Sequence, residues 1–141
     1  MRVCVIDGRG GGLGCRLVAG LRAIEGLDCQ IIALGTNVAA AEAMRHAGAE
    51  QTAAGPQAIT NTVQTVDVIV ASLNMVLPGA MLGEVTPEIV QAILAAKAKK
   101  VLLPLNRAQV EIVGSEDRTL DMLIARSLSR VRALVPPTCQ A

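Results

Sequence analysis

Uninterrupted apolar runs alternate along this chain with segments whose apolar residues recur at helical spacing. The apolar runs are typical of strands buried on both faces of a sheet. They cover residues 2–7, 29–34, 66–71 and 101–105, with a weaker strand near 50–52. The periodic segments predict helices over 12–24, 38–47, 56–64, 87–96 and 119–132. This alternation predicts an α/β fold, a three-layer Rossmann-like domain with a mainly parallel sheet.

Right-handed crossovers and the usual doubly wound topology predict the strand order 3-2-1-4-5-6. The sixth strand is expected over 109–113, where polar and apolar residues alternate. Only Asn106-Arg107-Ala108 separates it from the strand before it, which is too short for a parallel crossover. We therefore expect an antiparallel hairpin at the sheet edge. The domain is expected to cover residues 1–134, followed by a frayed tail over 135–141.

A glycine-rich stretch lies between the first strand and the first helix. Its spacing, met by Gly8, Gly12 and Gly14, resembles the nucleotide-binding loop of short-chain dehydrogenases. Glycine reaches positive φ without a Cβ clash and lets a phosphate approach the amides that open a helix. The stretch therefore predicts a phosphate-binding loop. Its residues are Asp7, Gly8, Arg9, Gly10, Gly11, Gly12, Leu13 and Gly14.

Ligands of doubly wound sheets bind at the carboxyl ends of the strands, beside the point where the strand order reverses. Two roles stay open for Asp7, which either bonds the amides of its own turn or contacts the ligand. The connection 72–85 is long for a compact α/β unit, which favours a functional loop or a partner surface. The polar residues expected at the other strand ends are Thr36, Asn37, Ser72, Asn74, Asn106 and Arg107.

The chain has no Phe, Tyr or Trp, and this absence restricts its chemistry. No tyrosine can act as a catalytic acid, and no aromatic ring can stack on a flavin or a nucleic-acid base. The formal net charge of +1 argues against a nucleic-acid partner or an acidic membrane surface. No apolar run approaches the ~20 residues of a membrane helix and no secretory signal is visible, so a cytoplasmic location is expected.

We expect no metal site in this chain. The four cysteines, Cys4, Cys15, Cys29 and Cys139, form no C-x-x-C pair, and a structural role is favoured for most of them. Cys15 is the exception, because a position at a helix N-terminus lowers the pKa of a thiol.

Four stretches of the chain resemble a family of short uncharacterised bacterial proteins, domain of unknown function 3842. The resemblance extends over nearly the whole chain and implies a Rossmann-like fold, but it carries no activity with it. The stretches are Val5 to Gly14, Ile32 to Asn37, Met81 to Pro87 and Leu103 to Arg107.

Three functions stay open from the sequence. The chain is a sensor or regulatory module for a nucleotide or a phosphorylated metabolite, a small nicotinamide-dependent oxidoreductase, or a subunit of a homo-oligomer whose glycine loop is vestigial. The expected cofactor is NADP or NAD, with NADP(H) favoured because Gly35-Thr36-Asn37 ends the second strand without an acid. We expect a homodimer formed through the loop 72–85 or the helix 87–96.

Overall fold

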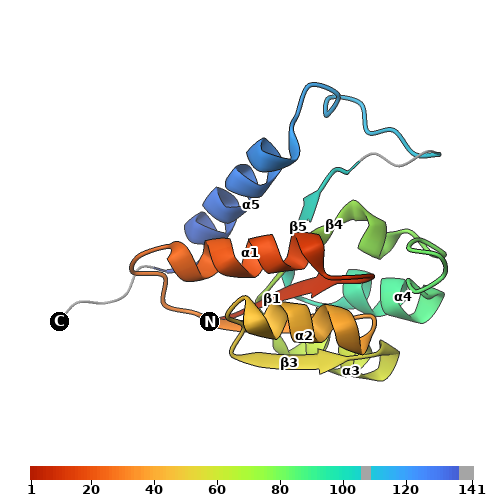
Figure 1. Cartoon of the computed structure of the whole chain (residues 1–141), viewed down its shortest axis with the longest axis horizontal. Helices are drawn as coiled ribbons and strands as arrows, with labels where there is room; N and C mark the ends of the chain where they lie inside the picture. The colour runs from red at the N-terminus through yellow and green to blue at the C-terminus, as the bar shows by residue number, and fades with distance from the viewer. Residues whose placement is uncertain (106–108, 137–141) are drawn as a thin grey trace.

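A five-stranded parallel sheet forms the middle layer of the molecule (Figure 1). The computed structural model of the chain describes residues 1–105 and 109–136. The strand order is β3-β2-β1-β4-β5, as predicted for the first five strands, so the order reverses between β1 and β4. The strands are β1 (Arg2–Asp7), β2 (Gln30–Gly35), β3 (Gln51–Ala54), β4 (Val68–Ser72) and β5 (Lys99–Leu103).

Helices cover both faces of the sheet, and β1 alternates its side chains between the two resulting cores. Val3 and Val5 belong to the core beneath α1, α2 and α5, whereas Cys4 and Ile6 belong to the core beneath α3 and α4. Because these four side chains are no more than 1% exposed, β1 is the central buried strand. The helices are α1 (Gly12–Ala23), α2 (Val38–His46), α3 (Pro56–Thr62), α4 (Pro87–Ala95) and α5 (Leu120–Leu134), with 3₁₀ turns η1 (Val63–Thr65) and η2 (Leu73–Val76).

Side-chain caps fix the starts of the helices that follow β2 and the long connection. Asn37 Oδ1 accepts a hydrogen bond from the amide of Ala40 at 2.8 Å, which caps α2. Thr86 Oγ1 accepts one from the amide of Ile89 at 3.3 Å, with Pro87 at the first position of α4. Both caps satisfy amides that have no partner within the helix.

The predicted antiparallel strand over 109–113 is wrong. Of these described residues only Val110 makes an isolated bridge, and none joins the sheet. Residues 109–119 instead lie beyond the sheet and lead back to α5 (Figure 1). A turn reverses the chain where Ser115 donates to the carbonyl of Ile112 from both its amide and its hydroxyl, and Gly114 takes a φ of 97°. A five-residue alternation is too short a signal to specify pairing against this turn.

The C-terminal boundary of the domain stays a prediction, because residues 137–141 lie outside the described part of the chain. Val135 still packs into the core at 5% exposure. Among residues 1–105 and 109–136, no helix is both long and apolar enough to cross a membrane.

Candidate functional site

The glycine loop joins β1 to α1 by a tight turn at the reversal point of the sheet. The amide of Gly11 donates to the carbonyl of Gly8 at 2.9 Å, which closes the turn. Gly11 and Arg9 both have positive φ, at 74° and 51°. A left-handed conformation costs a non-glycine residue on the order of 1–3 kcal/mol and is concentrated at functional sites. The conformation of Arg9 is therefore one indication of a site.

Asp7 holds the loop together from within. Its Oδ1 accepts from the amide of Gly8 at 2.8 Å, and its Oδ2 accepts from the amide of Gly14 at 2.7 Å. The N-cap of α1, Gly11, has no side chain, so the buried Asp7 carboxylate takes over the capping of the first turn. Of the two roles predicted for Asp7, the structure shows the bonding of turn amides.

The five glycines of the loop divide into two groups. A Cβ on Gly8 would lie 2.5 Å from Met81 Sδ, and one on Gly14 would lie 2.5 Å from Met44 Sδ. Gly11 needs its positive φ. These three glycines are required by the fold itself.

Gly10 and Gly12 belong to the second group. Neither has a positive φ, and a Cβ on either would meet no described atom within 4 Å. Of the 13 glycines in the chain, they are the two for which the described structure supplies neither reason. Glycine costs backbone entropy on folding, and at these two positions neither a close contact nor a positive φ requires it. The space above them is therefore where a ligand could approach the backbone closely.

The same loop presents backbone donors to this space. No described residue accepts a hydrogen bond from the amides of Gly10, Gly12 or Leu13. They lie at the N-terminus of α1, a 12-residue helix, where the helix dipole favours an anion. They surround a cavity of about 150 Å³, which we call the cradle. It is lined by Asp7, residues 8–13, Ser72, Met81 and Leu105.

Two buried polar side chains at the end of β4 have no partner among the described residues. Both Ser72 and Asn74 are 2% exposed, and neither Ser72 Oγ nor Asn74 Nδ2 makes a hydrogen bond there. A buried polar group without a partner costs about 1–3 kcal/mol. The β1–β4 pairing ends at Ile6 and Ala71, so Ser72 lies next to Asp7 on the floor of the cradle. These orphaned groups point to a polar ligand.

A larger and mostly apolar cavity adjoins the cradle. It has a volume of about 650 Å³ and shares Arg9 and Met81 with the cradle. Asn74 is its buried polar residue, and Met81 and Leu82 both have a φ of 56°. We call it the apolar cavity. Its other walls are residues 77–80, Gln109 and Val110.

Thr36 and Asn37, predicted as free donors at the end of β2, are already engaged. Thr36 Oγ1 donates to Glu84 Oε1 at 3.1 Å, and Asn37 Nδ2 donates to the same oxygen. The amide of Arg9 donates to Glu84 Oε2 at 3.2 Å. These hydrogen bonds, above all that from Asn37, lower the pKa of Glu84 below its ordinary value against the opposing effect of burial. Glu84 was not among the side chains predicted at the strand ends, because it comes from the connection 72–85.

Two further predictions concern residues near the loop. Asn106 and Arg107 lie outside the described residues, directly after Leu105 of the cradle. The expected lowering of the Cys15 pKa is wrong. Burial raises the pKa of this thiol, and the Asp7 carboxylate raises it further. Among residues 1–105 and 109–136, no group of three or more His, Cys, Asp or Glu side chains could hold a metal ion.

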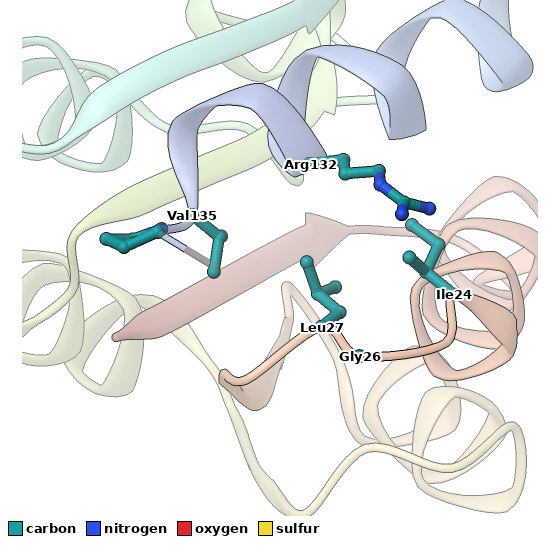
Figure 2. Close-up of a pocket in the computed structure, with 6 residues that line it drawn as sticks. Ile24, Gly26, Leu27, Arg132 and Val135 are labelled. Carbon is teal, nitrogen blue, oxygen red and sulfur yellow. The ribbon is translucent and has the colours of Figure 1, made fainter. Parts of the chain in front are cut away.

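Another hollow lies at the opposite end of the sheet, where α1 and α5 end (Figure 2). It has a volume of about 130 Å³, and the exposed Arg132 reaches across it toward Ile24. Unlike the cradle, it is lined by no described side chain that is polar, buried and without a described partner. Because Gly10, Gly12 and the unpartnered Ser72 hydroxyl meet at the cradle, the cradle with its adjoining apolar cavity is the candidate site.

Comparisons with known proteins agree with this architecture. A family model described as "Domain of unknown function (DUF3842)" matches residues 2–136. A comparison with curated proteins finds no match. The fold is similar to the crystal structure of a dodecameric FMN-dependent UbiX-like decarboxylase from Escherichia coli O157:H7, with a TM-score of 0.54 and 16% identity over 100% of both chains. At this identity the likeness shows the shared Rossmann-like α/β fold.

Proposed function

We propose that this chain, which belongs to the DUF3842 family, binds a nucleotide or another phosphorylated metabolite at its glycine loop and acts as a sensor or regulatory module. The observation that carries the proposal is the open space above Gly10 and Gly12, two glycines that the described fold does not require. A single Rossmann-like domain over residues 1–134 and a cytoplasmic location are parts of the same proposal.

The phosphate group would lie in the cradle. The amides of Gly10, Gly12 and Leu13 offer donors without described partners, and the exposed Arg9 adds a positive charge beside them. Ser72 Oγ would gain the partner that it lacks among the described residues. Asn106 and Arg107 follow Leu105 in the chain and complete the proposed set.

The organic part of the ligand would lie in the apolar cavity. Leu77, Met81 and Val110 supply aliphatic contacts in a chain that has no aromatic rings. Asn74 Nδ2 supplies a buried donor for one carbonyl or hydroxyl oxygen of the ligand. A nucleotide, with its phosphate at one end and a flat polar-edged group at the other, has this distribution of chemistry.

The sequence-based preference for NADP(H) over NAD(H) loses its main support, because Thr36 and Asn37 donate to Glu84. FMN enters as a further candidate because the similar decarboxylase is FMN-dependent. All three nucleotides carry a phosphate that suits the cradle, so titration has to decide among them.

A nicotinamide-dependent oxidoreductase is the alternative enzyme function. The short-chain dehydrogenase loop would require a catalytic tyrosine, which the chain lacks. The carboxylates of Asp7 and Glu84 are already hydrogen-bonded to the glycine loop and to the β2 end. The Glu84 carboxylate has no general acid or base as a partner among the described residues, which favours a binding module over an enzyme. The other alternative is a structural subunit of an oligomer in which the loop binds nothing.

Calorimetric titration of the purified full chain with FMN, NADP(H), NAD(H) and inorganic phosphate tests the proposal. We expect at least one of the nucleotides to bind, and Gly12→Val to abolish that binding while the protein stays folded. The valine side chain would fill the cradle, where Gly12 has open space. Equal affinity of the variant and the parent would remove the glycine loop from the site. If none of these probes binds, the result favours the structural alternative.

A further inference from the structure

The end of β2 is the place where a Rossmann site receives the second half of a dinucleotide. In this chain a carboxylate from a distant segment lies there. Glu84 accepts hydrogen bonds from Thr36 Oγ1, Asn37 Nδ2 and the amide of Arg9. The other polar atom of Asn37, Oδ1, caps α2. The polar groups at the β2 end are therefore satisfied by the chain itself.

The segment that carries Glu84 is held by hydrogen bonds within its own backbone. We call residues 77–86 the latch loop. Its amides close on its own carbonyls, with Gly79 donating to Val85 at 2.8 Å and Val85 donating to Ala80 at 3.1 Å. Val85 is fully buried in the core beneath α4. The latch loop is thus held in place by its own backbone hydrogen bonds and by the burial of Val85.

Met81 brings the latch loop against the glycine loop. Its Sδ occupies the space that a Cβ on Gly8 would need, and Thr36 Oγ1 lies 2.6 Å from the same hypothetical atom. The three residues therefore pack closely on the β2 side of the loop. Any group that extends from the cradle over β2 would have to displace Met81 and the Glu84 network.

The β4 side of the cradle is different. Ser72 and Asn74 have polar atoms without described partners, and the apolar cavity continues the cradle in that direction. The side of the site with unpartnered polar atoms lies toward β4, and the side with hydrogen-bonded polar groups lies toward β2. The two sides are therefore separated by β1.

We infer that the site, granted the phosphate binding proposed above, accepts compact mononucleotide-sized phosphomonoesters directed toward β4, and that Glu84 is the specificity-determining residue that excludes dinucleotides. The latch loop, which Glu84 holds against β2, blocks the adenosine half sterically. For NADP(H) alone, the Glu84 carboxylate also repels the additional phosphate on the adenosine ribose. Excluding a competitor by clash and like charge is a general route to specificity.

The test compares each dinucleotide with the mononucleotide that it contains: FMN against FAD, and nicotinamide mononucleotide against NAD. For every pair that binds, we expect the mononucleotide to bind at least about tenfold tighter to the full-length parent by calorimetry. Glu84→Ala should reduce this ratio, because it frees the latch loop from β2. The matched control Glu88→Ala, at an exposed carboxylate in the first turn of α4, should leave the ratio as in the parent.

The outcomes separate the two proposals. A dinucleotide that binds the parent as tightly as its mononucleotide overturns the inference and leaves phosphate binding intact. A ratio that Glu84→Ala leaves unchanged overturns the role of Glu84. If Glu84→Ala does not fold, Thr36→Val replaces it, because it removes one hydrogen bond that holds Glu84 at β2 and leaves the Asn37 cap of α2 in place, so the ratio should again fall. Absence of binding by all four nucleotides and by inorganic phosphate overturns the proposed function, and the inference with it.

Discussion

Ser72 and Ser127 are a matched pair of buried serines with opposite hydrogen-bonding states. Both side chains belong to residues at most 7% exposed, but Ser127 Oγ donates to the carbonyl of Leu123 at 2.8 Å whereas Ser72 Oγ has no described partner. Removing an orphaned hydroxyl removes a desolvation cost, and removing a bonded one removes a hydrogen bond. We expect Ser72→Ala to raise the free energy of unfolding by about 1 kcal/mol and Ser127→Ala to lower it by a similar amount.

Urea denaturation of the parent and both variants measures this difference. Ser72→Ala should also weaken the binding of the ligand identified by titration, since Ser72 lines the cradle. A variant that is less stable than the parent and binds equally well would show that Ser72 has a structural role.

From the sequence, the residues at the strand ends were easier to predict than their hydrogen bonds and pKa shifts. Ser72 ends a buried strand and Asn74 follows it, and parallel strands bring their carboxyl ends to one edge of the sheet. The position of Glu84 at the end of β2 was not predicted, because Glu84 reaches β2 only through the fold of the latch loop. The predicted direction of the Cys15 pKa shift was wrong, because a prediction from the helix N-terminus alone takes account of neither burial nor the nearby Asp7 charge.

At the scale of elements, the latch loop should be sensitive to pH. The folded pKa of Glu84 lies below its ordinary value, chiefly because Asn37 donates to it. The ionised carboxylate therefore stabilises the folded state above the unfolded pKa, and this contribution is lost as the pH falls through the folded pKa. We expect Glu84→Gln to lower the free energy of unfolding by about 1–3 kcal/mol at neutral pH, and by less as the solution is acidified.

Urea denaturation across acidic and neutral pH tests this expectation, with Glu25→Gln as the control. Glu25 is exposed just after α1 and makes no hydrogen bond or ion pair among the described residues. Its substitution should change stability by less than about 0.5 kcal/mol. A destabilisation by Glu84→Gln that is the same at every pH would contradict the role of the charge.

The order of the five paired strands followed from the sequence because few topologies connect parallel strands with right-handed crossovers. The edge was predicted wrongly for a local reason. Alternating side chains over 109–113 indicated a strand, but Val110 lines the apolar cavity and the turn at Gly114 directs the chain toward α5. Pairing at an edge depends on what else the segment contacts, and the sequence pattern alone does not contain that information.

At the scale of the whole molecule, apolar side chains remain exposed on the two segments expected to form an interface. Leu82 of the latch loop is 91% exposed, and Leu94 of α4 is 55% exposed. Singly exposed leucines are common, so their number does not establish an interface.

We expect light scattering at micromolar concentration to give twice the mass of the chain. A stable interface buries about 800 Å² per partner, and fully burying a leucine side chain in it contributes about 1.5–3 kcal/mol. Leu82→Ser should shift the protein toward the monomer if the latch loop forms the contact, and Leu94→Ser should do so if α4 forms it. Because the latch loop also covers the β2 end through Glu84, a contact through Leu82 would link subunit association to the candidate site. In that case a ligand that binds the dimer more tightly than the monomer must also strengthen the dimer, whereas a monomeric parent would exclude this coupling.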